Sequence, residues 1–362
     1  MKRHTVALIL PYFGTLPNYF PLWLKSAGYN TYFTFILFTD CDMSGYNVPD
    51  NVKVIPMTLD GVRKLIAPHL DFEFVLDTPY KLCDYKPMYG LIFQDWLKGY
   101  DFWGFCDPDV IWGNLNNYVT DELLDRFGRL YINGHFQLLR NTEDVRRFVL
   151  HRIPNWNISY EDVYRTSRYM QIDEFEMPEN LFSNFTDGGG GGQFYAPHFA
   201  NIQPCFKEFR RSNDRIRTSY RLGKAIPAFR WKDGKLTAIS VGGDTGINIE
   251  FMYVHLFRRA MNFTPGIENE NSFLIIPNDF IKDHELSAEE IQQLITPDEN
   301  YERDFWLNNA KSRYPIFIPT RLSRIKHFLA RILLKNDPER IIKVKKLINR
   351  IFRRKLPKKL QM

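Results

Sequence analysis

Residues 100–115 read YDFWGFCDPDVIWGNL and place two carboxylates, Asp107 and Asp109, inside an otherwise aromatic and apolar run. Aspartate and proline are common in turns, so the stretch is consistent with a polar turn between two buried segments. Buried carboxylates are costly unless they pair with a cation, and their oxygens suit hard cations such as Mg²⁺ or Mn²⁺. The stretch therefore predicts either a turn or a metal site whose ligands are Asp107 and Asp109.

Short apolar runs alternate with helical patterns on the amino-terminal side of this stretch. Aromatic and β-branched residues predict strands at residues 5–12, 31–40 and 51–57. Helical patterns with start and stop signals lie between or after them, at residues 16–30, 59–70 and 86–100. This alternation predicts an α/β fold with a largely parallel sheet covered by helices.

Several polar or aromatic residues follow predicted strands directly. Tyr12 and Phe13 follow the first strand, Asp40 ends the second, and Asp107 follows a later one. Ligands of such sheets bind outside the carboxyl ends of the strands. We therefore expect these residues to lie around one crevice.

The segment YKLCDYKP, residues 80–87, adds Asp84 and Lys86. If both face the crevice, Asp84 is suited to bind a hydroxyl group and Lys86 a phosphate. The alternative is a surface salt bridge at the start of a helix.

A later apolar strand pattern, residues 248–257, contains His255 and is followed by Arg258 and Arg259. A neutral histidine at a strand end can complete a metal site, and an arginine can neutralise phosphate. A lone histidine on an apolar strand is otherwise a hydrogen-bonded core residue.

The composition excludes general disorder, because 44% of the 362 residues are hydrophobic and 15% are aromatic. No apolar run reaches the roughly 18 residues that span a bilayer. The four cysteines are scattered without a CxxC pair, which favours a reducing cytoplasm and no disulfide framework or structural zinc.

The carboxyl terminus differs in charge from the rest of the chain. Residues 321–362 hold 15 Lys and Arg against two acids, or +13 within a total of +6, which leaves −7 for the body. Apolar residues recur at helical spacing between these cations. The pattern predicts a basic amphipathic helical tail that binds an anionic membrane surface; a solvated helical hairpin and an RNA-binding tail are the alternatives. Nothing in the body predicts nucleic-acid binding.

Taken together, these segments resemble a GT-A-fold glycosyltransferase. The resemblance rests on PYFG in the first strand, DYKP at residues 84–87, the DPD followed by IWGN, and the late histidine followed by arginines. It is nearest to a poorly characterised bacterial family encoded with capsule and lipopolysaccharide genes. That family is distantly similar to the retaining galactosyltransferase and glycogenin group.

The resemblance implies a GT-A-like nucleotide-sugar-binding mixed sheet flanked by helices. It implies a hexosyltransferase that uses Mn²⁺ or Mg²⁺, a donor that we expect to be a UDP-sugar, and a glycan or lipid-linked acceptor. By analogy with the strand after the DxD motif in that group, Asn133, Gly134 and His135 of YINGH would face the donor sugar. The segment HLFRRAM lacks the Gly and the Lys-Pro-Trp that follow the metal-binding histidine of the group.

The expected organisation is a catalytic domain at residues 1–265, an extension at 266–319 and the basic tail at 320–362. The donor half would cover residues 1–135 and the acceptor side residues 136–235. We expect a cytoplasmic enzyme on the inner face of the plasma membrane.

Residues on the acceptor side leave the catalytic base open. Asp173 and Glu174 are carboxylates that could accept the acceptor proton of an inverting enzyme, or they form a solvated acidic loop. A retaining enzyme needs no such base. The five glycines at residues 188–192 are consistent with a lid over the donor or with a linker.

Two other functions remain open from the sequence. A metal-dependent nucleotidyltransferase would share the sheet and the carboxylates, but it would need a basic, glycine-rich loop after the first strand. The residues there, LPYFGTLPNYF, are aromatic and uncharged. A non-catalytic, membrane-associated glycan-binding protein would use its aromatic residues to stack on sugars.

Overall fold

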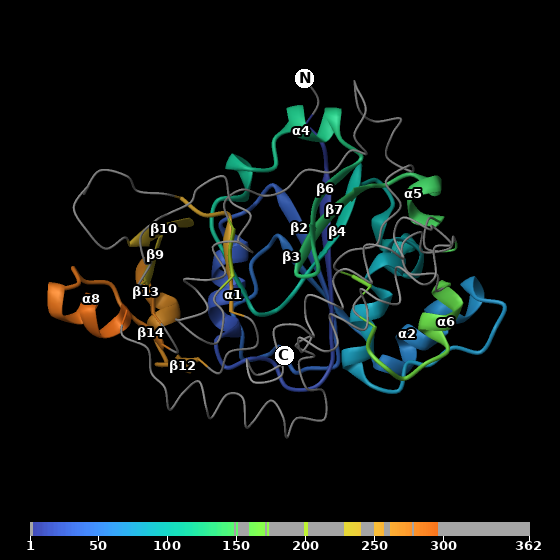
Figure 1. Ribbon diagram of the computed structural model, residues 1–362, viewed down its shortest axis with the longest axis horizontal. Helices are drawn as coiled ribbons and strands as arrows, with labels where there is room; N and C mark the ends of the chain where they lie inside the picture. The colour runs from blue at the N-terminus through green and yellow to red at the C-terminus, as the bar shows by residue number, and fades with distance from the viewer. Residues whose placement is uncertain are drawn as a thin grey trace, which may run out of the picture. The chain divides into compact units, whose positions relative to one another are not determined.

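A six-stranded mixed sheet lies at the centre of the computed structural model (Figure 1). Its strand order is β3-β2-β1-β4-β7-β6; the first four strands are parallel, and β7 is antiparallel to both of its neighbours. The strands are β1 (Val6–Tyr12), β2 (Phe33–Thr39), β3 (Val52–Pro56), β4 (Phe102–Cys106), β6 (Arg129–Asn133) and β7 (Phe136–Arg140). The predicted α/β class with a mixed sheet flanked by helices is confirmed.

The structure describes residues 3–147, 150, 159–170, 172–173, 199–201, 228–239, 250–256, 261–276 and 279–295. The chain divides into two compact units, residues 1–298 and 299–362, and everything described belongs to the first. Glu174, the glycine run, Arg258, Arg259 and the predicted tail lie outside the described residues. The finer domain boundaries stay predictions.

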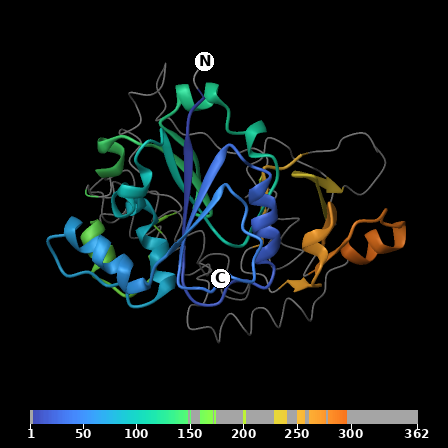
Figure 2. The ribbon, with the colours of Figure 1, turned by 180° about the vertical axis from the view of Figure 1, so that it is seen from behind.

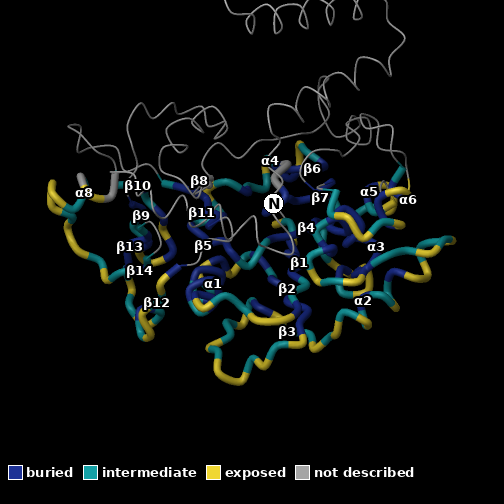
Figure 3. Tube along the Cα trace, turned by 60° about the horizontal axis from the view of Figure 1, so that its bottom comes forward, coloured by how far each residue is buried: buried dark blue, intermediate teal, exposed yellow. Residues whose placement is uncertain are grey.

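Helices cover both faces of the main sheet (Figures 1 and 2). They are α1 (Phe20–Gly28), α2 (Leu59–Ile66), α3 (Tyr89–Ile92), α4 (Asp121–Arg126), α5 (Glu143–Arg147), α6 (Tyr160–Tyr164) and, near the second sheet, α8 (Ala288–Ile295). Ala7 and Ile9 of β1 belong to the core shared with α2, α3 and α6, whereas Leu8 points to the core shared with α1. Because both faces are buried, the strands read as continuous apolar runs; buried residues follow the central strands in Figure 3.

Two smaller sheets complete the described part. A five-stranded sheet has the order β10-β9-β13-β14-β12, and a three-stranded sheet has the order β5-β11-β8. Their strands are β5 (Val110–Trp112), β8 (Phe199–Asn201), β9 (Ala228–Lys232), β10 (Lys235–Ile239), β11 (Tyr253–His255), β12 (Asn262–Phe263), β13 (Ser272–Ile276) and β14 (Asp279–Lys282). The indole Nε1 of Trp231 in β9 donates to the carbonyl of Trp112 in β5, 2.9 Å away, which links the two smaller sheets.

The predicted helix over residues 86–100 is wrong in extent. The structure has a 3₁₀ segment η2 (Pro79–Met88), the single turn α3, and a second 3₁₀ segment η3 (Gln94–Leu97). Pro87 lies inside η2 and cannot donate the backbone hydrogen bond that a continuous α-helix needs. Further 3₁₀ turns are η1 (Ala67–His69), η4 (Leu115–Asn117) and η8 (Ile267–Asn269).

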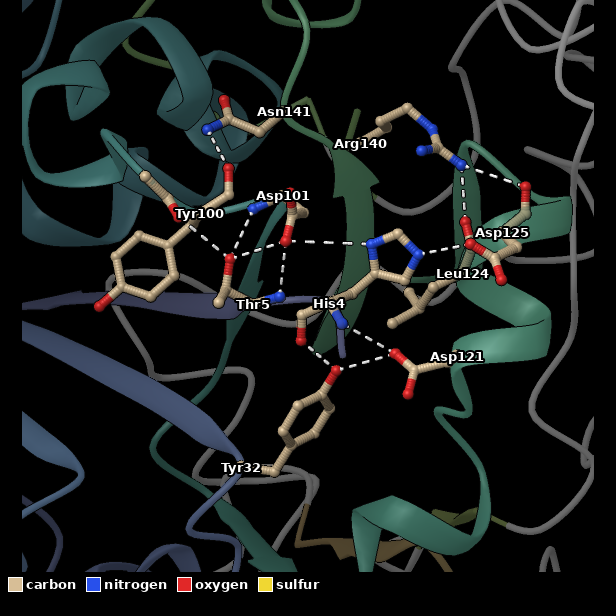
Figure 4. A network of polar contacts seen from close by, with 11 residues as sticks. His4, Thr5, Tyr32, Tyr100, Asp101, Asp121, Leu124, Asp125, Arg140 and Asn141 are labelled. Carbon is tan, nitrogen blue, oxygen red and sulfur yellow. Dashed lines mark hydrogen bonds and ion pairs between the residues drawn. The ribbon is translucent and has the colours of Figure 1, made fainter. Parts of the chain in front are cut away.

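A polar network fixes the amino ends of β1 and β4 (Figure 4). The amide and hydroxyl of Thr5 donate to one carboxylate oxygen of Asp101, at 2.8 and 2.9 Å. His4 lies beside it, with its Nε2 2.7 Å from Asp125 and its amide donating to Asp121 at 2.9 Å. These contacts hold the amino end of β1 to the amino end of β4 and to α4. They therefore lie at the end of the sheet opposite the carboxyl ends of the strands.

No helix among the described residues has both the length and the hydropathy needed to cross a membrane.

Candidate functional site

The carboxyl ends of β1 and β4 form the switch point of the main sheet. β1 pairs with β2 on one side and with β4 on the other, although β3 separates β2 and β4 in the chain. Ligands of open α/β sheets bind where the strand order reverses in this way. Asp107 follows β4 directly and Asp109 precedes β5, so the DPD turn lies at this point.

Asp109 and His255 come together through the pairing of β5 with β11. His255 stands opposite Val110 in this antiparallel ladder, and the amide of Leu256 donates to the carbonyl of Asp109 at 2.8 Å. As a result, His255 Nε2 lies 3.4 Å from a carboxylate oxygen of Asp109. Both residues are 7% exposed.

Asp107, Asp109 and His255 fit a divalent cation. One ligand atom from each lies within 4.8 Å of the other two. Ligand atoms on opposite sides of a Mg²⁺ ion are about 4.2 Å apart, so small side-chain shifts would bring the three atoms into one coordination shell. The two carboxylates suit Mn²⁺ or Mg²⁺, and a neutral imidazole can add a nitrogen ligand. The turn and metal-site interpretations are therefore compatible, since the turn carries two of the three candidate ligands.

Lys86 supplies a buried positive charge beside this group. Its ammonium lies 2.7 Å from Asp107 and 3.2 Å from Asp173, and it donates to the carbonyl of Gly134 at 2.6 Å. Burial alone would lower the pKa of Lys86, but the nearby anions, Asp107 foremost, raise it well above its ordinary value. These three contacts use the three protons of the Lys86 ammonium. The sequence predicts instead that Lys86 contacts a phosphate group.

Burial raises the pKa of Asp107, and the ammonium of Lys86 opposes that shift. Other contacts fix the backbone of Asp107: its amide donates to the carbonyl of His135 at 3.2 Å. Its carbonyl accepts from the indole of Trp23 in α1 at 3.1 Å. Trp23 carries no signal in the sequence, because it reads as one more apolar residue of an amphipathic helix.

The turn between β6 and β7 supports the site from the other side. The imidazole of His135 stacks on that of His255, with ring centroids 4.1 Å apart, and its Nδ1 lies 3.0 Å from the hydroxyl of Tyr253. Burial is the main cause that lowers the pKa of His135 well below its ordinary value, and electrostatic interactions with His255 and Lys86 lower it further. Burial therefore favours the neutral form of the His135 imidazole. Gly134 contributes its carbonyl to Lys86, and the side chain of Asn133 lies outside the description.

Tyr12, Phe13 and Asp40 lie at the ends of β1 and β2, as the sequence predicts. The amide of Gly14 donates to Asp40 at 3.2 Å and joins the two loops. Burial raises the pKa of Tyr12, with smaller contributions from Cys41 and Asp109, and its hydroxyl donates to the carbonyl of Thr15 at 2.7 Å. Phe13 is only 7% exposed and packs in the core.

Asp84 lies apart from the site. It is fully buried and pairs with Lys81 at 2.8 Å, and it accepts hydrogen bonds from the amide of Met170 at 2.8 and 3.1 Å. It is thus neither beside Asp107 nor part of a surface salt bridge. Lys81 was missed because nothing in its sequence context distinguishes it from a surface lysine.

Asp173 reaches the site and Glu174 lies outside the described residues. Asp173 is 4% exposed, and it contacts Lys86 and, at 3.2 Å, the hydroxyl of Tyr169. Asp173 is therefore not part of a solvated acidic loop.

Residues 8–284 match a family of unknown function, DUF6625. No curated protein matches the chain. Among solved structures, the galactosyltransferase LgtC in complex with donor and acceptor sugar analogs is 12% identical over 82% of this chain and 99% of its own, with a TM-score of 0.36. Mouse xyloside xylosyltransferase 1 is 9% identical over 70% of this chain and 98% of its own, with a TM-score of 0.34. The glycosyltransferase GlyE of Streptococcus pneumoniae TIGR4 is 9% identical over 88% of this chain and 67% of its own, with a TM-score of 0.30. At such scores, function has to be inferred from the site itself.

Proposed function

The chain belongs to this family of unknown function, and we propose from its site that it is a metal-dependent glycosyltransferase with a nucleotide-sugar donor. The observation that carries the proposal is the group of Asp107, Asp109 and His255, whose ligand atoms lie within 4.8 Å of one another. It lies at the switch point of the sheet, where such folds bind nucleotides. Carboxylates that share a divalent cation with a diphosphate are the expected arrangement for this chemistry.

Asp107, Asp109 and His255 would hold Mn²⁺ or Mg²⁺. The ion would act as a Lewis acid that stabilises negative charge on the leaving nucleoside diphosphate. Lys86 would keep Asp107 ionised and oriented, because its ammonium binds one carboxylate oxygen at 2.7 Å. The neutral ring of His135, stacked on His255, would limit the rotation of that ligand without adding charge.

The remaining donor contacts follow from the placement of the strand ends. Tyr12 and Phe13 would lie near the base of a UDP-sugar, and Asp40 would lie nearby through its hydrogen bond with Gly14. The peptide of Gly134 and the backbone around it would face the sugar. Arg258 or Arg259, which follow β11 in the sequence, would share the neutralisation of the diphosphate.

Asp173 and Glu174 would act at the reacting sugar. Asp173 is held against Lys86 rather than in solvent, which supports a role at the site. An inverting enzyme would use a carboxylate as base, whereas a retaining enzyme would use an acid or amide near the anomeric carbon.

The acceptor we propose is a glycan or a lipid-linked glycan of bacterial surface polysaccharide synthesis. The support is the charge of residues 321–362, which is +13 in a chain of +6. A basic tail of this kind would hold the enzyme at the anionic inner face of the plasma membrane.

The test is thermal stabilisation by a panel of nucleotide sugars with and without Mn²⁺. We expect one UDP-sugar to raise the melting temperature in the presence of Mn²⁺, and a chelator to abolish the shift. Asp109→Asn should weaken Mn²⁺ binding by more than about 100-fold, since removal of a residue that only supports a ligand already costs 10–100-fold. Asp71→Asn is the matched control, because Asp71-Phe-Glu73 is an exposed acid-x-acid motif.

Other outcomes separate the alternatives. No response to any nucleotide would reject the proposal. Stabilisation by nucleoside triphosphates in preference to nucleotide sugars would favour a nucleotidyltransferase. Glycan binding that survives Asp109→Asn, without metal-dependent nucleotide binding, would favour a non-catalytic glycan-binding protein.

A further inference from the structure

Lys81 and Asp84 form a buried ion pair outside the metal site. The ammonium of Lys81 lies 2.8 Å from a carboxylate oxygen of Asp84, and the two side chains are 1% and 0% exposed. Both residues belong to η2, the segment that also carries Lys86.

The remaining hydrogen bonds of this pair go to the backbone of a distant segment. Lys81 donates to the carbonyls of Val163 at 2.9 Å and Arg168 at 2.8 Å, so its three protons are all used. Asp84 accepts from the amide of Met170 at 2.8 Å and from that of Ile172 at 3.5 Å. The pair therefore holds the backbone at four points between α6 and Asp173: Val163, Arg168, Met170 and Ile172.

Asp173 follows Ile172 directly, and one residue spans at most about 3.6 Å. The anchored backbone thus limits where the carboxylate of Asp173 can lie. It lies 3.2 Å from Lys86, which in turn lies 2.7 Å from the metal-ligand candidate Asp107. A chain of contacts therefore runs from the Lys81–Asp84 pair through Asp173 and Lys86 to Asp107.

We propose that Lys81 and Asp84 are positioning residues that hold Asp173 against Lys86 and so set the charge balance at Asp107. The proposal rests on the proposed function, because it assigns the pair a role in the proposed metal site. A buried ion pair contributes little net stability compared with apolar residues of the same size. What apolar residues cannot replace is the set of hydrogen bonds that the pair makes to the backbone of residues 163–172.

The first experiment tests the anchoring without metal. Asp84→Asn removes the charge and keeps the shape, and the double variant Lys81→Met/Asp84→Leu removes both charges together, which avoids an unpaired buried charge. In both variants we expect faster hydrogen–deuterium exchange of peptides covering residues 163–173. We also expect faster acylation of the Lys86 amine, measured by mass spectrometry. Asp60→Asn is the matched control, because it removes the acid of an exposed ion pair with Lys64.

The second experiment tests the consequence for the metal site by titration with Mn²⁺ alone. When Asp173 leaves Lys86, the ammonium is balanced by Asp107 only, and the cation is repelled more strongly. We expect Asp84→Asn and Asp173→Asn each to raise the Mn²⁺ dissociation constant by about threefold to tenfold, below the 10–100-fold loss for residues that touch a ligand. The Asp84→Asn/Asp173→Asn double variant should show no further increase, because the first change acts through the second residue.

Unchanged exchange and unchanged Lys86 acylation in both Asp84 variants would overturn the proposal. So would effects on Mn²⁺ affinity that multiply in the double variant, since a purely structural role predicts independent losses. If the unmodified protein binds no Mn²⁺, the metal part of the proposed function fails, and the exchange and acylation results still decide whether the pair positions Asp173.

Discussion

At the scale of single residues, the most consequential feature is a lysine that lies between carboxylates. Lys86 contacts Asp107 and Asp173 and is 4% exposed. A cation in this position compensates for the cost of burying Asp173 and of partly burying Asp107, whose side chain is 25% exposed. It also leaves Asp109, on the other side of the turn, to face His255.

Replacing Lys86 by methionine should destabilise the protein by about 3–5 kcal/mol, because it leaves the buried carboxylate of Asp173 without its cation. Mn²⁺ should restore part of the loss. Chemical denaturation with and without Mn²⁺ measures both effects.

Lys98→Met is the control, because Lys98 forms an exposed pair with Asp95 at 2.7 Å and such pairs contribute about 0–1 kcal/mol. Equal losses in the two variants would contradict a buried compensating role for Lys86.

The position of Asp107 and Asp109 after a strand could be predicted from the sequence, whereas the residues that Lys86 and Asp84 contact could not. Asp107 and Asp109 are carboxylates that directly follow a recognisable strand, so their local context places them. Lys86 and Asp84 are two residues apart, but one reaches Asp107 and the other reaches Met170. A residue's partner across the fold depends on how the chain packs, which the local pattern of residues does not contain.

At the scale of elements, β4 tolerates no side chain at Gly104. A Cβ there would lie 2.1 Å from the carbonyl oxygen of Gln137 in β7. Gly104→Ala should therefore separate β4 from β7 and cost about 1–3 kcal/mol or more. It should also weaken Mn²⁺ binding, because Asp107 follows β4.

Denaturation and Mn²⁺ titration of Gly104→Ala and Gly45→Ala would check this expectation. Gly45 is the matched control, since a Cβ there meets nothing within 4 Å. A Gly104→Ala variant as stable as Gly45→Ala would show that the two strands are not in close contact.

The start of α8 gives a pH-dependent prediction. Hydrogen bonds from the amide of Ser287, and then from His284, lower the pKa of Glu290 to about 2, and Glu290 in turn raises the pKa of His284. The folded protein therefore binds the His284 proton more tightly than the unfolded chain. This contribution to stability is complete below about pH 6.5 and is lost as the pH rises through the raised pKa.

An NMR titration of the histidine rings would measure this shift. In Glu290→Gln, the pKa of His284 should fall toward 6.5. The lowered pKa of His69, which is caused mainly by burial, should stay where it is. An unchanged His284 titration in the variant would rule out this interaction.

Strands were easier to predict than helices in this chain. The runs that form β1, β2 and β3 are local signals, and their short length and their β-branched and aromatic content distinguish them from helices. The segment after Lys86 has an apolar pattern of helical spacing, but Pro87 interrupts its hydrogen bonding. In addition, Gly90 lies against the indole of Trp103, and such close packing depends on a residue that is distant in the sequence.

At the scale of the whole molecule, we expect metal binding and membrane binding to belong to different units of the chain. The described unit carries the proposed metal site, and the excess of positive charge lies in the second unit, residues 299–362. Truncation after Pro319 should leave the Mn²⁺ titration unchanged and abolish flotation with anionic liposomes. Each basic residue near such a surface contributes about 1 kcal/mol.

Neutral liposomes and high salt are the controls for the flotation assay. Neutral liposomes lack the anionic charge that attracts the tail, and high salt shortens the range of that attraction below the roughly 10 Å it has at 0.1 M salt. Equal flotation of the full-length and truncated proteins would reject the membrane role of the tail.

The pairing of β5 with β11 has a consequence for how the protein is made. Asp109 leaves the ribosome long before His255 does; at about 5–20 residues per second, translation of the stretch between them takes about 7–30 s. During that interval the nascent chain can assemble the parallel strands β1 to β4 without the third candidate ligand. Loading of the proposed metal site would therefore belong to the last stage of biosynthesis, and cells starved of manganese should still accumulate protein with an intact main sheet.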